Sequence, residues 1–485
     1  MVSSVRDELS TEQWNQSSRT LIFIVYISMF LDNILLTIVV PIIPEYLYNL
    51  EENFLGENGR VAILLSSKAV VQLVINPVVG VLMSRTGHQI PLFVGSLCLL
   101  LSSLLFAFAR RYAWLLVARS LQGIASACIG VAGMCLVAER YPEEGGSRGK
   151  IMGVVLGATA LGVLLGYPLG GLLYDFTGGK KTPFLVVAVL VSIDTVLQLL
   201  FLDLKPIPKR PVLSEASKNV PNLLRNWKVL VTIGAIWVST SAMSILEPCL
   251  PIWLMDTIKP KRWQIGMVFI PDSLGYLLGT NFLGGFAFHI GRWKVATAAM
   301  LLVGVSAIMV ASSTSMGQLI GPHFGIGLGI GAVDSALVPL LALLVECNLQ
   351  NHNSGTIQKS SEGDEGVFAA QYATVYALQQ TAVSLAYSLG PILGGELVYL
   401  VGFPWLMRTV GLLNILYCPL LMILQQREIT NNSIPKGEDK ETQNIIMSTT
   451  TSTNYRTGNN EQKSWIPSKL RFSSYHRFYD LDDSD

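Results

Sequence analysis

The feature that most constrains this chain is the recurrence of apolar runs long enough to cross a lipid bilayer. About 20 consecutive apolar residues span the hydrocarbon core as a helix, and such runs recur between Leu21 and Leu424. Only 14% of the 485 residues are charged, whereas soluble domains carry about 25%. The sequence therefore predicts an all-α membrane protein.

The apolar runs are twelve in number, and this predicts twelve transmembrane helices. The predicted spans are residues 20–47, 60–84, 90–109, 113–139, 148–174, 183–203, 227–256, 264–288, 293–313, 317–346, 367–399 and 403–424. The polar N-terminus lacks a cleavable signal, so we expect the first helix to direct membrane insertion.

The longest connection between predicted helices divides them into two sets of six. It is rich in lysine and arginine, and such loops stay on the cytoplasmic side. Because an even number of spans puts both termini on one side, we expect both in the cytosol, although Arg110 and Lys181 are cations on the opposite side. The predicted domains are a cytosolic N-terminus (1–19), an N-terminal six-helix half (20–203), a cytosolic linker (204–226), a C-terminal six-helix half (227–424) and a disordered cytosolic tail (425–485).

Two motifs recur between the halves. GVLMSRTGH begins at Gly80 and GGFAFHIGRW begins at Gly284, and each has another glycine seven residues after its first. GYPLGG at Gly166 is echoed by GPILGG at Gly390. Two six-helix halves built from repeats are a transporter architecture. The alternative is that small-residue motifs recur by chance in helical membrane proteins.

Five ionisable residues lie in the middle of apolar runs, namely Asp32, Glu247, Asp334, Lys68 and Arg119. Such a residue costs at least about 2.5 kcal/mol at the bilayer centre, so each needs a functional or structural reason. The functional interpretation is a central acidic cavity in which carboxylates bind either a substrate cation or a proton. The structural alternative is ion pairing, for example of Asp32 with Lys68.

Aromatic residues near these acids are candidates to surround a cation. They are Trp253, Phe269, Tyr276, Tyr376 and Tyr387. Cation–π contact contributes up to about 2 kcal/mol when it is desolvated. The alternative is ordinary packing, or anchoring at the membrane interface.

Several classes of function are excluded by what the sequence lacks. There is no GxxxxGK[ST] motif, no metal-type cysteine spacing and no nucleophile–base set, so we expect neither an enzyme nor a cofactor. The formal net charge of +1 indicates no nucleic-acid surface. Energy for transport is therefore expected from an ion gradient or from the solute itself. We expect a monomer.

Three motifs resemble those of the major facilitator superfamily. They are R-x-x-Q-G at Arg119–Gly123, GVLMSRTGH with Ser84 in place of the usual aspartate, and a glycine-rich helix 5 with its proline displaced to Pro168. Longer segments, including LDNILLTIVVPIIPEYLY, SSKAVVQLVINPVVG, LEPCLPIW, GYLLGTN and GIGAVDSALVP, resemble the vesicular amine transporters. GYLLGTN favours the monoamine branch. The resemblance covers roughly residues 20–424.

The resemblance implies a proton-coupled antiporter that loads a cationic amine, such as serotonin, dopamine or histamine, into acidic secretory or synaptic vesicles by alternating access. The implied substrate-binding residues are Asp32, Asn33, Glu247, Trp253, Phe269, Tyr276, Asp334 and Tyr387. The implied proton-coupling residues are Asp334, Asp32, Glu247, Arg119 and Lys68. The alternatives are a carrier for acetylcholine, a polyamine or another organic cation, and a non-transporting relative.

The chain departs from the family pattern in three places. Gln380 stands where monoamine members have an aspartate that pairs with the helix 2 lysine, so Lys68 is expected to be neutral or to pair with Asp32. Asp272 stands where a small neutral residue is expected. The segment NLEENFLGENGR is short and lacks a glycosylation sequon.

The tail carries one short motif. Glu441, Ile445 and Ile446 resemble an acidic dileucine signal, which implies vesicle-sorting adaptors as partners. The alternative is a chance match.

Overall fold

The computed structural model of the chain describes residues 19–40, 42, 57–141, 146–177, 179–202, 225–259, 267–353 and 361–422. The chain divides into two units, Met1–Gln426 and Arg427–Asp485, and every described residue belongs to the first. The predicted tail with its sorting motif, residues 1–18 and most of the linker lie outside the described residues. So do the side chains of Ser84 and Arg85.

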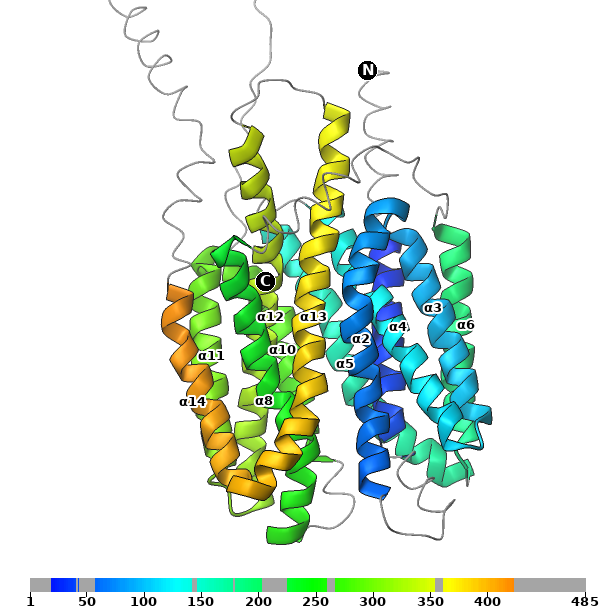
Figure 1. Cartoon of the computed structure of the whole chain (residues 1–485), viewed down its shortest axis with the longest axis vertical. Helices are drawn as coiled ribbons and strands as arrows, with labels where there is room; N and C mark the ends of the chain where they lie inside the picture. Colours follow the sequence, from blue (N-terminus) through cyan, green and yellow to red (C-terminus); the bar gives the residue numbers. More distant parts are fainter. Residues whose placement is uncertain are drawn as a thin grey trace, which may run out of the picture. The chain divides into compact units, whose positions relative to one another are not determined.

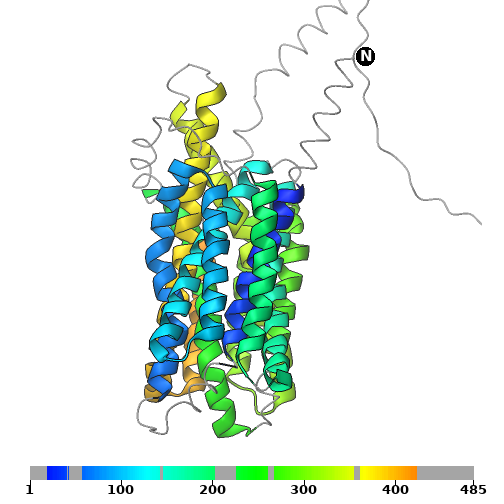
Figure 2. The same cartoon turned by 90° about the vertical axis from the view of Figure 1, so that its right-hand side faces the viewer.

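Twelve helices and no strand make up the regular structure of the described residues. They are a first helix at Arg19–Val40, α2 (Glu57–Thr86), α3 (Gln89–Phe108), α4 (Tyr112–Arg140), α5 (Ser147–Thr177), α6 (Lys181–Phe201), α8 (Trp227–Thr257), α10 (Ile270–Ile290), α11 (Arg292–Val310), α12 (Met316–Asn353), α13 (Ser361–Val401) and α14 (Phe403–Met422). Figures 1 and 2 show them running side by side as one bundle. The predicted all-α fold is confirmed.

Eleven of the described helices are long and apolar enough to cross a membrane. The other is α10, which is 21 residues long but contains several polar residues and packs against α5 and α12. Its polar residues Asp272, Ser273 and Thr280 are buried in the bundle, which explains how a helix of lower apolar content is accommodated there. The chain is a multi-pass membrane protein.

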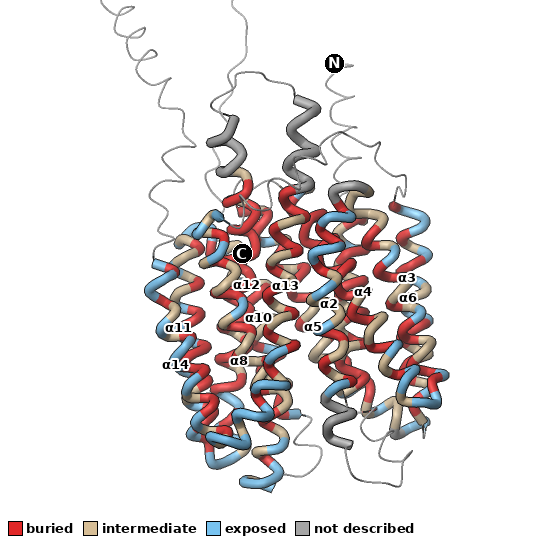
Figure 3. The backbone as a smooth tube through the Cα atoms, viewed as in Figure 1, coloured by how far each residue is buried: buried red, intermediate tan, exposed pale blue. Residues whose placement is uncertain are grey.

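Burial in the bundle follows the pattern expected of a protein in lipid. Buried residues concentrate in α4 and α12, whereas the outer helices carry exposed residues (Figure 3). Large exposed apolar side chains lie on α6 and α14, among them Ile193, Leu200, Leu412 and Leu416. Apolar surface of this extent is not stable in water, so these faces are lipid-facing.

The first repeated motif occupies equivalent places in the two halves. Gly80 on α2 packs against Ala377 of α13, where an added Cβ would lie 2.7 Å from the Ala377 Cβ. Gly284 on α10 packs against Gly149 of α5, where an added Cβ would lie 2.5 Å from the Gly149 carbonyl oxygen. Each glycine therefore permits close packing on a helix of the other half.

The second glycine of that motif also serves one purpose in both halves. Gly87 has φ +78° and Gly291 has φ +110°, and each follows the last residues of its helix. L-residues with a side chain rarely adopt such values, so glycine ends the helix at both positions.

The second repeated motif is equivalent in the same way. Gly166 on α5 packs against Ile34 and Thr37 of the first helix, and Gly390 on α13 packs against Ser244 of α8. In each half, therefore, the fifth helix meets the first helix through this glycine. The recurrence predicted from sequence corresponds to recurring helix contacts.

Some predicted helix bounds are wrong. The helix predicted at 264–288 is α10, which begins at Ile270, with Phe269 as the N-cap residue and Pro271 in its first turn; residues 264–266 lie outside the described residues. The helix predicted to reach residue 313 ends at Val310. α12 and α13 are 38 and 41 residues long, longer than the spans predicted, and they extend beyond the other helices in Figure 1.

Candidate functional site

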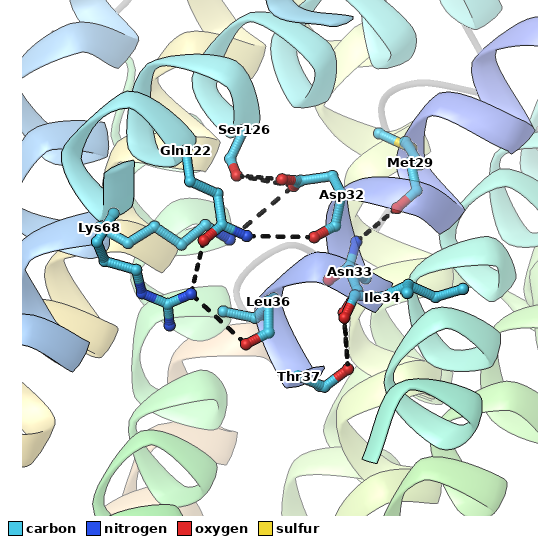
Figure 4. Close-up of polar contacts among 10 residues, drawn as sticks. Met29, Asp32, Asn33, Ile34, Leu36, Thr37, Lys68, Gln122 and Ser126 are labelled. Atoms are coloured by element: carbon cyan, nitrogen blue, oxygen red, sulfur yellow. Dashed lines mark hydrogen bonds and ion pairs between the residues drawn. The ribbon is translucent and has the colours of Figure 1, made fainter. Parts of the chain in front are cut away.

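Asp32 on the first helix is bonded by side chains of two other helices, α2 and α4. Its side chain is buried, with 6% of the residue exposed. Ser126 Oγ on α4 lies 2.7 Å from both carboxylate oxygens and donates to them, and Lys68 Nζ on α2 lies 3.9 Å from Oδ2 (Figure 4). The pairing of Asp32 with Lys68, the structural alternative in the sequence, is therefore present.

Arg119 connects α4 to the first helix. Its Nη1 donates to Gln122 Oε1 at 2.6 Å and to the Leu36 carbonyl oxygen at 3.5 Å. Gln122 Nε2 in turn donates to the Asp32 carbonyl oxygen at 3.5 Å (Figure 4). The arginine and glutamine of R-x-x-Q-G thus act together, one turn apart on the same helix face. Arg119 also interacts electrostatically with Glu247.

Glu247 on α8 links the two halves of the bundle. Its Oε1 accepts a hydrogen bond from Tyr167 Oη on α5 at 2.9 Å. It also interacts electrostatically with Arg119 and Lys68. Pro248 follows it inside α8 and cannot donate a backbone hydrogen bond, so α8 continues past this carboxylate with one helical hydrogen bond missing.

Asp334 on α12 is held by one phenol. Tyr276 Oη on α10 donates to Asp334 Oδ2 at 2.8 Å. The other oxygen, Oδ1, has no hydrogen-bond partner among the described residues. Tyr387 on α13 interacts electrostatically with Asp334 and with Glu247, so the three residues share one region.

Asp272 belongs to the same group. It lies in the first turn of α10, buried, and its Oδ1 has no hydrogen-bond partner among the described residues. It interacts electrostatically with Glu247 and with Tyr387. Asp272, which departs from the family pattern in the sequence, therefore lies beside the predicted site.

The remaining aromatic candidates divide between the site and the apolar core. Phe269 stacks on Tyr167, the partner of Glu247, with ring centroids 6.2 Å apart. Trp253 stacks on Phe403 at 4.8 Å and packs against the core of the C-terminal half. Tyr376 is fully buried and donates to the Val338 carbonyl oxygen at 3.4 Å. No interaction with the buried carboxylates was found for Trp253 within the described ranges.

Asn33 is oriented differently from its neighbour Asp32. Its Nδ2 donates to the Met29 carbonyl oxygen of its own helix at 2.8 Å (Figure 4). Its Cβ faces Gly162 of α5, which has no side chain to exclude it. The first helix thus directs Asp32 toward α4 and Asn33 toward α5.

Sequence reasoning missed one buried carboxylate. Asp194 on α6 is buried and its Oδ2 accepts from Ser28 at 2.9 Å, Ser96 at 3.2 Å and Gln198 at 2.9 Å. It lies in the apolar run VSIDTVLQLL, so the criterion that selected Asp32 would have selected it too. Tyr167 and Ser126, which bond the site carboxylates, carried no comparable signal because such residues are common in membrane helices.

An ion pair joins the two halves at the beginning of α5. Arg148 Nη2 lies 2.6 Å from Glu346 Oε1 on α12. Tyr372 of α13 donates to the same oxygen, and Arg148 Nε donates to the Tyr141 carbonyl oxygen at 2.9 Å. The helices that meet here come from both halves, so this cluster holds that end of the bundle together.

Comparison with known proteins agrees with this architecture. Residues 22–360 match the family model described as the Major Facilitator Superfamily. The chain is 36% identical over 493 residues to a Homo sapiens protein named synaptic vesicular amine transporter, covering 86% of this chain and 91% of that protein. It is 33% identical over 423 residues to a Danio rerio protein named probable vesicular acetylcholine transporter-B, covering 84% of this chain and 79% of that protein.

A solved structure has the same fold. The crystal structure of the human organic anion transporter TETRAN aligns with a TM-score of 0.69 at 17% identity, covering 83% of this chain and 99% of that one. At this identity the likeness concerns the fold alone.

Proposed function

The chain belongs to the major facilitator superfamily and, within it, to the family of vesicular amine transporters, and on this basis we propose that it moves a cationic amine into an acidic vesicle in exchange for protons. The observation that carries the proposal is the gathering inside the bundle of four carboxylates, of which Asp32, Asp272 and Asp334 are buried and Glu247 is partly buried. They come from both halves, on the first helix, α8, α10 and α12. Buried acids in a membrane interior need a cationic partner.

The carboxylates are proposed to alternate between two ligands. Asp334 has one oxygen without a partner, so it can accept either a proton or an ammonium N–H. A site that accepts one or the other, but not both, couples their movements in opposite directions. Glu247 and Asp32 contribute to the substrate site, where Arg119 and Lys68 set the local charge.

Alternating access is proposed to occur by rocking of the two halves around this site. The contacts that would open and close lie between halves: Arg148 with Glu346 at one end, and Tyr167 with Glu247 deeper in the bundle. In the proposed orientation, with the linker 204–226 and both termini in the cytosol, the Arg148 end faces the cytosol. The halves 20–203 and 227–424 are proposed as the moving bodies of a monomeric carrier.

A non-transporting relative is less well supported than a carrier. The feature that favours a non-transporting relative is Gln380, which stands where monoamine members of the family have an aspartate that pairs with the lysine of helix 2. Lys68 has Asp32 at 3.9 Å instead, so the charge is compensated by another route.

The proposal is tested by uptake into acidified vesicles containing the full-length protein. A panel of radiolabelled amines, including serotonin, dopamine, histamine, acetylcholine and a polyamine, is offered with and without a protonophore. Saturable uptake that the protonophore abolishes supports the proposal. Saturable binding of an amine without any pH-driven flux would instead favour a binding protein on the same scaffold.

A further inference from the structure

The charges inside the bundle do not balance. Lys68 is paired with Asp32, and Arg119 and Lys68 are the cations that interact with Glu247. The two cations are thus engaged with two of the four carboxylates near the candidate site. A fifth acid, Asp194 on α6, is buried and instead accepts hydrogen bonds from Ser28, Ser96 and Gln198. The remaining two of the four acids are Asp272 and Asp334.

Asp272 and Asp334 have no cation from the protein. Each is more than nine-tenths buried, with 7% and 8% of the residue exposed. Each has an Oδ1 without a hydrogen-bond partner, and no lysine, arginine or histidine of the described ranges interacts with either. Removing an ionised carboxylate from water costs several kcal/mol unless it is paired. Each acid therefore either holds a proton or, when ionised, takes up a cation from outside the protein.

Both acids lie near the same two tyrosine side chains, Tyr276 and Tyr387. Tyr276 follows Asp272 by one turn on the same face of α10, and it donates to Asp334 on α12 at 2.8 Å. Tyr387 on α13 interacts electrostatically with both acids. Tyrosine rings of this kind favour an ammonium group through cation–π contact.

We propose that Asp272 and Asp334 form a subsite for two cationic groups, so that the substrate is a diamine with one ammonium for each carboxylate. The inference rests on the proposed function and names its substrate class. A diamine leaves neither acid unpaired, whereas a monoamine of the same chain length leaves one. Each carboxylate holds a proton when the diamine is absent and releases it when an ammonium group takes its place.

The test compares matched ligands on the purified full-length protein. Putrescine is compared with butylamine and cadaverine with pentylamine, by thermal stabilisation and by inhibition of amine uptake into acidified proteoliposomes. The diamine of each pair is expected to act at a concentration at least about tenfold lower, which corresponds to about 1.4 kcal/mol. The wild-type comparison needs no variant, so it stands even if a substitution impairs folding.

Variants of Asp272 then test whether this residue binds the second ammonium group of the diamine. Asp272→Asn is expected to bring the diamine-to-monoamine ratio close to one, and Asp272→Glu is expected to retain the preference. The matched control is Asp256→Asn, which changes an exposed carboxylate of α8 and is expected to leave the ratio as in wild type. Retention of the full preference in Asp272→Asn would overturn the assignment.

The failure of this inference is distinguishable from failure of the proposed function. Protonophore-sensitive uptake without any preference for the diamine overturns the inference and leaves the proposed function intact. No protonophore-sensitive uptake of any probe overturns the proposed function, and equal stabilisation by both members of each pair then overturns the inference as well.

Discussion

Lys68 Nζ lies 3.9 Å from Asp32 Oδ2, and this pair joins α2 to the first helix inside the bundle. Gln380 occupies the place where the family resemblance led us to expect an acid for this lysine. The lysine therefore neutralises the carboxylate of the first helix, which also accepts a hydrogen bond from Ser126. The carboxylates of α10 and α12 are left without a protein cation.

The Asp32–Lys68 pair is testable by a double-mutant cycle. Lys68→Gln leaves a buried carboxylate unpaired and is expected to lower the free energy of unfolding by about 3–5 kcal/mol. Asp32→Asn combined with Lys68→Gln removes both charges, so the double variant is expected to be less destabilised than the sum of the single variants. Thermal unfolding of the purified proteins measures each value. Strictly additive effects would show that the two side chains do not interact.

The glycine contact between α5 and α10 predicts a steric effect. A Cβ at Gly284 would lie 2.5 Å from the Gly149 carbonyl oxygen, so Gly284→Ala is expected to force the helices apart at a cost of about 1–3 kcal/mol. The adjacent Gly285 is the matched control, because its Cβ would meet only Lys150 Cβ at 3.9 Å. Gly285→Ala is expected to be neutral or slightly stabilising, since alanine favours a helix over glycine by about 1 kcal/mol. Equal melting temperatures for the two variants would contradict this packing.

If the ion pair between Arg148 and Glu346 is removed, we expect the bundle to open at the end where this pair lies. Glu346→Gln weakens the contact between α5 and α12, so that end is expected to open more often. The native Cys135 on α4 can report on this opening, because its side chain is buried. It interacts electrostatically with Tyr376, which also interacts with Arg148. Its alkylation by a maleimide, followed by mass spectrometry, is expected to become severalfold faster.

A matched control separates opening from general loosening. Glu139 lies 2.9 Å from His88 Nδ1, and both residues belong to the N-terminal half. His88→Gln therefore breaks an ion pair that does not cross between the halves and leaves in place Glu139, which interacts electrostatically with Cys135. The alkylation rate of Cys135 is expected to stay near that of wild type. Equal acceleration in both variants would argue against a gate at Arg148.

Much of the fold follows from sequence because lipid imposes simple rules. Runs of apolar residues gave the helices, and the paired glycines, such as Gly80 and Gly284, marked equivalent contacts between halves. One helix boundary that the sequence did not predict is the beginning of α10, because the apolar run at Phe269 continues through Pro271, which lies in the first turn of the helix. Hydropathy alone does not register that change.

The ionisable residues of the candidate site could be predicted from the sequence, but their hydrogen-bond partners could not. Asp32, Glu247 and Asp334 stand out as ionisable residues in apolar runs, whereas their partners Ser126, Tyr167 and Tyr276 do not. Tyr167 and Glu247 are far apart in sequence and meet only when the two halves pack. Trp253, a candidate in sequence, stacks on Phe403 because α8 turns that side chain toward the apolar core.

The most direct test of the central claim is amine accumulation by Asp334→Asn in acidified vesicles. Asparagine keeps the shape of the side chain but can neither release a proton nor carry a negative charge. We predict that the variant reaches the membrane in wild-type amount and loses protonophore-sensitive accumulation of labelled amine. Full proton-driven accumulation by Asp334→Asn would contradict the account, because amine and proton would then not share this carboxylate.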